Sequence, residues 1–179
     1  MSPDRHLDTE ALGDHIDRLY RAARSMCGSR EEAEDLVQET FARVLRKPRV
    51  IRSEDDIGYL LRVLRNTFVS TRRTAARRPQ TTALPDDLDL IADRNSTRPD
   101  ARIESEQLYA AISALPDDFR DALVAIDVVG LSYREASKAL RVREATITTR
   151  LHRARQRVAK VLTEADANLP QVRSRTSDD

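Results

Sequence analysis

Apolar residues recur at intervals of three and four along most of this 179-residue chain, and no stretch alternates convincingly between apolar and polar residues. Such spacing gives a helix one apolar face, whereas a half-buried strand would alternate. The first apolar stripe consists of Leu12, Ile16, Leu19, Ala23 and Met26. The spacing therefore predicts an all-α fold.

Two further stripes follow the first, and the three helices predict one compact bundle over residues 8–78. Gly28 is suited to end the first helix, and Ser29 with Glu32 matches a capping box that would start the second. The third helix is expected to begin near residue 55. The inward-facing residues expected of the second and third helices are Ala33, Leu36, Val37, Phe41, Val44, Leu45, Ile57, Leu60, Leu61, Leu64 and Phe68.

Residues 79–100 differ in composition, with three prolines, several aspartates, serine and threonine, which is typical of a linker. A second helical unit is predicted over residues 101–165, followed by a polar tail over residues 166–179. The sequence thus predicts two small helical domains joined by a flexible linker. The inward-facing residues expected of the second domain include Leu108, Ala111, Ile112, Leu115, Phe119, Leu123, Ile126, Val129, Ala136, Ala139, Leu140, Ile147, Leu151, Ala154 and Val158.

The second domain contains the pattern of a helix-turn-helix. Ser132 and Glu135 match a capping box that would start a short helix, and a turn follows that leads into "EATITTRLHRARQRV" at residues 144–158. Threonine is a mediocre helix former, so the three threonines here favour a role other than packing. In a helix-turn-helix the second helix lies in the major groove of DNA.

The outer face of this second helix carries groups that can bind DNA. If Ile147 and Leu151 are buried, helical spacing places Thr146, Thr149 and Arg153 together on the opposite face. Threonine can contact a base edge or a thymine methyl group, and arginine can bind guanine through two hydrogen bonds. The flanking positions, where phosphates would lie, hold Arg150, Arg155 and Arg157. The alternative is a solvated cationic face on a helix that only packs.

A second basic concentration lies on and after the third helix, with no acidic residue between its members. Its arginines are Arg62, Arg65, Arg72, Arg73, Arg77 and Arg78. Asn66, Thr67, Ser70 and Thr71 lie among them and add hydrogen-bonding groups. The favourable interaction of cations with a helix C-terminus would account for one or two of these arginines. The full set favours a surface that binds nucleic acid with strong salt dependence.

The second helix, by contrast, has an acidic and polar outer face composed of Glu31, Glu32, Asp35, Gln38 and Glu39. This face would repel phosphates. It is therefore either a solvated face, which is the usual case for such charge, or a docking surface for a protein.

Two segments resemble a known family. "AEDLVQETFARVLR" is similar to the core-binding helix of bacterial sigma factors, the promoter-recognition subunits of RNA polymerase. "LPDDFRDALVAIDVVGLSYREASKALRVREATITTRLHRARQRV" resembles their C-terminal helix-turn-helix. The similarity covers about residues 12–162, and a plan of two domains resembles the extracytoplasmic-function (group 4) type.

The resemblance implies a role for each matching residue. The residues expected to bind the clamp region of the largest subunit of core RNA polymerase are Asp35, Gln38, Glu39 and Phe41. Those expected to melt and read the −10 promoter element are Arg62, Arg65, Asn66, Thr67, Arg72 and Arg73. Those expected at the −35 element are Ser132, Tyr133, Arg143, Thr146, Thr148, Thr149, Arg150 and Arg153. The family also implies restraint by an anti-sigma factor.

The chain departs from the family at the turn of the helix-turn-helix. The family often has glycine where Arg141 stands, at a turn that tends to require a positive φ. Only glycine adopts such a conformation without a steric penalty, so we expect Arg141 to cost some stability and to add charge near DNA.

Other classes of function find little support. Cys27 is the only cysteine, which excludes an intramolecular disulfide, and a buried free thiol is expected there. The histidines are scattered and no nucleophile–base pair or phosphate-binding loop is evident, so we expect no catalytic residues, metal or cofactor. No apolar run could cross a membrane, so we expect a cytoplasmic protein without membrane insertion. The main alternative is a stand-alone helix-turn-helix regulator whose N-terminal bundle dimerises or senses a signal.

Overall fold

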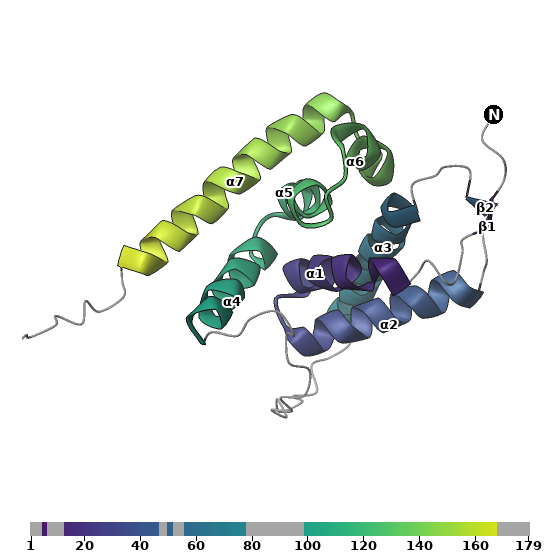
Figure 1. Cartoon of the computed structure of the whole chain (residues 1–179), viewed down its shortest axis with the longest axis horizontal. Coiled ribbons are helices and arrows are strands. Elements are labelled where there is room, and N and C mark those ends of the chain that lie inside the picture. The colour runs from purple at the N-terminus through teal and green to yellow at the C-terminus, as the bar shows by residue number, and fades with distance from the viewer. Residues whose placement is uncertain (1–4, 7–12, 47–49, 52–55, 78–98, 168–179) are drawn as a thin grey trace, which may run out of the picture.

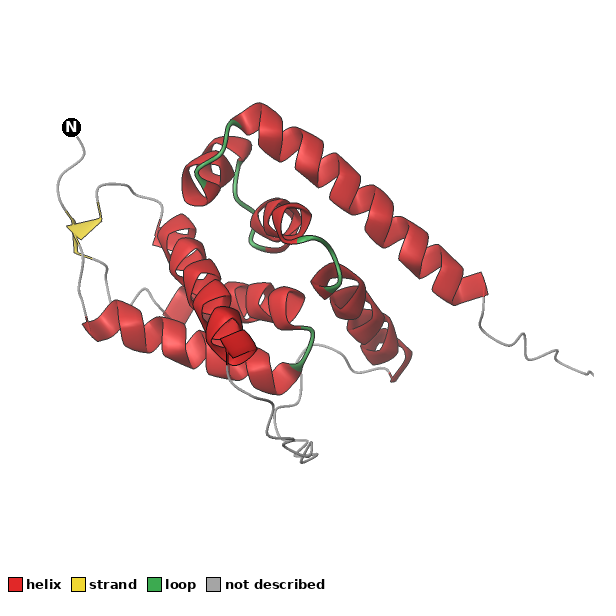
Figure 2. Cartoon of the chain, turned by 180° about the vertical axis from the view of Figure 1, so that it is seen from behind, coloured by secondary structure: helices red, strands yellow, loops and turns green. Residues whose placement is uncertain are grey.

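The computed structural model describes residues 5–6, 13–46, 50–51, 56–77 and 99–167. Within these ranges the chain is helical except for short turns and one antiparallel pair of two-residue strands (Figure 2). These strands are β1 (Arg5–His6) and β2 (Val50–Ile51). The predicted all-α fold is confirmed. Most of the predicted linker and tail lies outside the described residues.

The N-terminal unit comprises η1 (Gly13–His15), α1 (Ile16–Cys27), α2 (Arg30–Arg46) and α3 (Asp56–Arg77). The helix ends follow the sequence signals. Gly28 adopts a positive φ of 79° and its N–H donates to the carbonyl of Arg24 at 2.9 Å, which ends α1. The hydroxyl of Ser29 accepts from the N–H of Glu32 at 3.2 Å, which starts α2 as predicted.

The C-terminal unit comprises α4 (Pro99–Ser113), α5 (Asp117–Leu123), η2 (Val124–Val128), α6 (Tyr133–Leu140) and α7 (Glu144–Ala167). α5 continues directly into η2, where the N–H of Val129 donates to the carbonyl of Val124 at 2.9 Å, five residues earlier. Such wide turns occur mostly as short insertions within helices. α4 begins at residue 99, so the last two residues of the predicted linker belong to this helix.

Most of the predicted apolar stripes are buried, including every inward residue expected of α3. Three predicted core positions are wrong, since Ile16, Leu45 and Leu108 are 47%, 55% and 39% exposed. Ile16 is the first residue of α1 and Leu45 is the last but one of α2. Helical spacing continues to a helix end, whereas packing concentrates towards the middle.

The two units share one hydrophobic core, which the sequence did not predict. A single cluster of buried residues runs from Leu19 and Leu64 in the N-terminal unit to Ile112 and Ile147 in the C-terminal unit. α1 packs against α4 and η2, and α3 packs against α6. In Figure 1, α4 and α5 lie between α7 and the N-terminal helices. The relative placement of the units decides which charged faces remain accessible.

Candidate nucleic-acid interface

α6 begins at a complete capping box. The hydroxyl of Ser132 accepts from the N–H of Glu135 at 3.3 Å, and the Glu135 carboxylate accepts from the N–H of Ser132 at 2.7 Å. These hydrogen bonds hold the pKa of Glu135 below its ordinary value. Ser132 and Tyr133 are exposed at this end of α6. The predicted start of the helix-turn-helix is therefore confirmed.

The turn between α6 and α7 is held by Arg141 in the left-handed conformation, with φ 56° and ψ 43°. Of the described residues other than glycine, it alone has a positive φ, as the sequence predicted. The N–H of Val142 donates to the carbonyl of Ser137 at 3.1 Å, and the Ser137 hydroxyl donates to the carbonyl of Val142 at 2.6 Å. The turn thereby orients α7 relative to α6.

The outer face of α7 presents threonine and arginine. Ile147 and Leu151 are buried, while Thr149 and Arg153 are exposed and Thr146 is half-buried. The hydroxyls of Thr148 and Thr149 donate to the carbonyls of Glu144 and Ala145, each at 3.1 Å. A threonine hydroxyl bound in this way keeps its oxygen as an acceptor on an exposed face.

The arginines that flank this face are held within the C-terminal unit. Arg150 pairs with Asp118 at 2.6 Å. Arg155 donates two hydrogen bonds to Asp127, at 2.9 and 2.6 Å, which raise its pKa above the ordinary value. Arg157 lies over the ring of Phe119. By contrast, Arg143 and Arg153 form no ion pair with any residue that the structure describes.

The predicted −10 residues of α3 fall into three groups. Asn66 and Arg73 are exposed. Thr67 is only 1% exposed, so its side chain does not reach the surface in this arrangement. The remaining three, Arg62, Arg65 and Arg72, all bond to the C-terminal unit.

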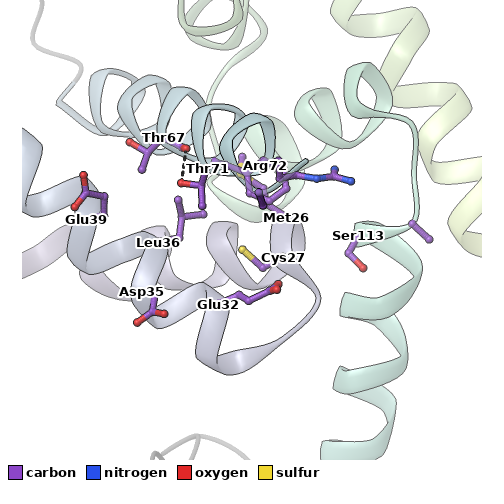
Figure 3. A pocket seen from close by; sticks show the side chains of 13 residues that line it. Met26, Cys27, Glu32, Asp35, Leu36, Glu39, Thr67, Thr71, Arg72 and Ser113 are labelled. Atoms are coloured by element: carbon purple, nitrogen blue, oxygen red, sulfur yellow. Dashed lines mark hydrogen bonds between the residues drawn. The ribbon is translucent and has the colours of Figure 1, made fainter. Parts of the chain in front are cut away.

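The predicted docking residues lie on the surface of α2. Asp35 and Gln38 are exposed, and Phe41 is half-buried against the core. Glu39 accepts from Arg43 at 2.7 Å, and this hydrogen bond lowers the pKa of Glu39. Asp35 and Glu39 lie at the rim of a pocket of about 590 Å³ (Figure 3).

That pocket has an apolar interior and an acidic edge. Met26 and Leu36 line it, together with Cys27, whose pKa is raised to about 12 by burial and by the nearby Glu32 carboxylate. Arg72 and Ser113 line its far side, so both units contribute to its wall. Because its pKa is raised, the Cys27 thiol is uncharged at neutral pH.

Sequence reasoning missed the residues that join the two units, above all Arg18, Arg24, Glu106 and Asp121. The side chain of Arg24, which follows Ala23 of the apolar stripe, is 2% exposed, although arginine is rarely buried without a partner. Helical spacing indicates which face of a helix is apolar, but it does not indicate a partner 82 residues away.

Comparison with known proteins identifies the family. Residues 12–78 match the Sigma-70 region 2 family, and residues 105–158 match the Sigma-70, region 4 family. The chain is also 31% identical over 159 residues to the ECF RNA polymerase sigma factor EcfG of Rhodopseudomonas palustris, with 86% of each chain covered. The chain belongs to the ECF family of RNA polymerase sigma factors.

This sigma factor is also 36% identical over 166 residues to the ECF RNA polymerase sigma factor SigE of Mycolicibacterium smegmatis. That match covers 90% of the sigma factor and 64% of SigE. A solved structure, the sigma factor RpoE in complex with the anti-sigma factor NepR from Bartonella quintana, shares the fold. It superposes with a TM-score of 0.65 at 25% identity, covering 86% of this chain and 95% of that one.

Family membership settles the class of function. The sigma factor acts in promoter recognition and transcription initiation with RNA polymerase. The alternative of a stand-alone regulator is set aside, because the match to EcfG extends through both units.

Proposed function

We propose that this sigma factor docks on core RNA polymerase through the outer face of α2 and contacts promoter DNA with two other surfaces. In this proposal α3 reads the −10 element, and the helix-turn-helix of α6 and α7 reads the −35 element. One observation carries the assignment, namely the separation of charge. The exposed N-terminal half of α2 is acidic, whereas the exposed C-terminal end of α3 and the exposed middle of α7 are basic. We further propose a first domain over residues 8–78 and a second over residues 99–167, which extends the predicted 101–165 to the ends of α4 and α7.

The docking surface consists of Asp35, Gln38 and Glu39, with Phe41 behind them. Asp35 and Gln38 form no side-chain bond with any described residue, so their polar groups are available to a partner. Carboxylates at this surface repel DNA and attract a basic protein. The clamp region of the largest polymerase subunit is the partner that the family resemblance implies.

The −35 surface centres on Arg143 and Arg153, with Thr146, Thr148 and Thr149 between them. These two arginines carry charge that no described carboxylate neutralises. Exposed arginine can bind guanine or phosphate, and threonine can contact a thymine methyl group. Ser132, Tyr133 and Arg150 lie at the edges of this surface.

Regulation by an anti-sigma factor is part of the proposal, since the related RpoE was solved with one. The sigma factor would position the polymerase and stabilise the unpaired strand without catalysing a reaction itself. Among the described helices none has the length and apolar content to cross a membrane. We propose that the protein works in the cytoplasm, where it meets polymerase and DNA.

Run-off transcription tests the proposal. Core polymerase is supplied with a genomic promoter library, with and without this protein, and new start sites are mapped. We expect starts that depend on the added protein and share sequence blocks near −10 and −35. The absence of new starts, together with failure to co-purify with core polymerase, would overturn the proposal.

A further inference from the structure

Arginines of the N-terminal unit bind acceptors of the C-terminal unit along a continuous seam. Arg18 donates through Nε to the carbonyl of Val129 at 2.9 Å, where η2 ends. Arg24 and Arg30 both donate to the carboxylate of Glu106 on α4, at 2.5 and 3.0 Å. In each of these bonds the N-terminal unit supplies the guanidinium donor and the C-terminal unit supplies the oxygen acceptor.

The same arrangement continues onto α3, at residues proposed to read DNA. Arg62 donates to the carbonyls of Lys138 and Ala139 near the end of α6, at 2.6 and 3.2 Å. Arg65 donates to the carboxylate of Asp121 on α5. The seam therefore occupies hydrogen-bond donors of the proposed −10 surface.

The N-terminal half of α5 adds further contacts to this surface. Asp117 lies 3.8 Å from Arg72. The guanidinium of Arg120 lies over the ring of Phe68, 5.0 Å from its centre. The C-terminal unit thus covers part of α3 sterically as well as through charge.

Carboxylates suit this position because they resemble phosphates to a guanidinium group. Both are oxygen anions that accept charge-assisted hydrogen bonds from arginine. Asp121 and Asp117 therefore take the places that backbone phosphates would need at Arg65 and Arg72. The two arrangements exclude each other, because the Nε groups of Arg62 and Arg65 already donate to the C-terminal unit, and α6 packs against the side of α3 on which a phosphate would approach them.

The seam also contains a buried carboxylate, Asp121, whose burial costs free energy as long as the two units are in contact. Asp121 is 6% exposed, and its burial raises its pKa even though Arg65 and Arg120 oppose the shift. Separating the units would return this carboxylate to water and remove the cost of its burial. That recovery offsets part of the lost Arg65–Asp121 attraction.

We infer that the C-terminal unit is an intramolecular competitor of −10 DNA, with Asp117 and Asp121 standing in for phosphates until the two units separate. The inference rests on the proposed function only for the identity of the DNA element. Arg143 and Arg153 stay exposed in the closed form. The free protein should therefore contact duplex DNA through α7 while α3 remains covered.

Pulsed electron spin resonance tests the closure itself. Spin labels are attached to Ser70→Cys on α3 and Gln156→Cys on α7, in a Cys27→Ser background of the full chain. Both positions are exposed and lie in different units. We expect a narrow distance distribution in the free protein and longer distances when core polymerase is added. A broad distribution in the free protein, or one that polymerase leaves unchanged, would overturn the inference.

Competition with DNA is measured separately, by fluorescence anisotropy of labelled single-stranded DNA. The double variant Asp117→Asn/Asp121→Asn should bind about tenfold more tightly than the wild type, because arginines are released to phosphates. The control Asp17→Asn/Glu164→Gln changes the net charge equally at exposed positions whose side chains make no bond across the seam, and should stay close to the wild type. Equal tightening in the two double variants would contradict competition at the seam.

Two further results keep the test decisive. Asp121 is buried, so Asp117→Asn alone is the milder variant: the Asp117 side chain is 66% exposed, and asparagine keeps an oxygen that can accept from the buried Arg120, which donates to Asp117 at 2.5 Å. Thermal unfolding of this variant is compared with that of the wild type to show that it folds. Asp117→Asn should tighten single-strand binding about threefold, and no tightening would count against the inference. A closed spin-label distribution with no new run-off starts would refute the proposed function but leave the closure standing.

Discussion

Arg24 of α1 and Glu106 of α4 form an ion pair across the two units, with Nη2 and Oε2 2.5 Å apart. The arginine side chain is 2% exposed and that of the glutamate 46%. Arg24 also donates to the carbonyl of Gly28 at 2.9 Å and lies over the ring of Tyr109. Burial opposes ionisation of Glu106, but hydrogen bonds from Arg24 and Arg30 outweigh it and lower its pKa. The end of α1 is thereby coupled to α4.

Arg24→Ala should destabilise the folded chain by roughly 3 kcal/mol, because it removes a buried guanidinium that bridges both units. Arg30→Ala is the matched control, since Arg30 binds the same carboxylate but is 31% exposed. An exposed pair contributes less than about 1 kcal/mol. Urea unfolding of both variants measures the difference, and equal losses would show that the burial of Arg24 does not matter.

Arg141→Gly should stabilise the protein by about 1 kcal/mol, because glycine adopts the left-handed conformation without the clash of a Cβ. Arg141→Ala removes the same charge but keeps the Cβ, so it should give no such gain. Thermal unfolding of the two variants separates backbone strain from charge. A gain of equal size in both would assign the effect to charge and contradict the strain at φ 56°.

The local structure of this chain could be predicted from its sequence, and the reasons are visible at single residues. Gly28 ends α1, the Ser132–Glu135 capping box starts α6, and Arg141 takes the positive φ expected of its position. Each of these features depends on residues within a few positions of one another. The apolar stripe of α3 was predicted for the same reason.

The packing of one unit on the other could not be predicted. Arg65 on α3 and Asp121 on α5 are 56 residues apart, and the residue type of Arg65 alone fits a DNA contact, a solvated surface or an ion pair equally well. The interpretation of Arg65 as a DNA-facing residue therefore did not foresee its ion pair with Asp121. Thr67 was assigned to the same surface because its residue type suits DNA contact, although it lies three residues after Leu64 on the buried stripe of α3.

Charge reversal on α2 should abolish binding to core polymerase. Asp35→Lys/Glu39→Lys replaces the acidic docking face by a basic one that repels a basic partner. The fold should be unaffected, because both positions are on the surface of α2. Pull-down with core polymerase measures binding, and Asp17→Lys/Glu164→Lys is the control with equal charge at other exposed sites. Similar binding by both variants would exclude α2 as the docking surface.

The thiol of Cys27 should react slowly with iodoacetamide at pH 8. Burial, aided by Glu32, raises its pKa from 9.0 to about 12. The raised pKa keeps the thiol protonated. At pH 8 the fraction of reactive thiolate is therefore on the order of a thousandfold lower than for a thiol with the ordinary pKa. The rate should keep rising with pH beyond 10, and urea should restore ordinary reactivity. Rates within about tenfold of each other in the folded and unfolded protein would contradict the raised pKa of this half-buried thiol.

Arg153 and Arg155 should contribute unequally to promoter binding although they lie two residues apart on α7. Arg153 is exposed and forms no ion pair with a described residue, whereas Arg155 must first release Asp127. Arg153→Ala should weaken binding to a −35 duplex by about tenfold or more, as loss of a direct base contact does. Arg155→Ala should weaken it less than about threefold, uniformly across sequences. Fluorescence anisotropy with a promoter found by run-off transcription, at fixed salt, measures both. A larger loss from Arg155→Ala would move the recognition surface from the centre of α7 to its flank.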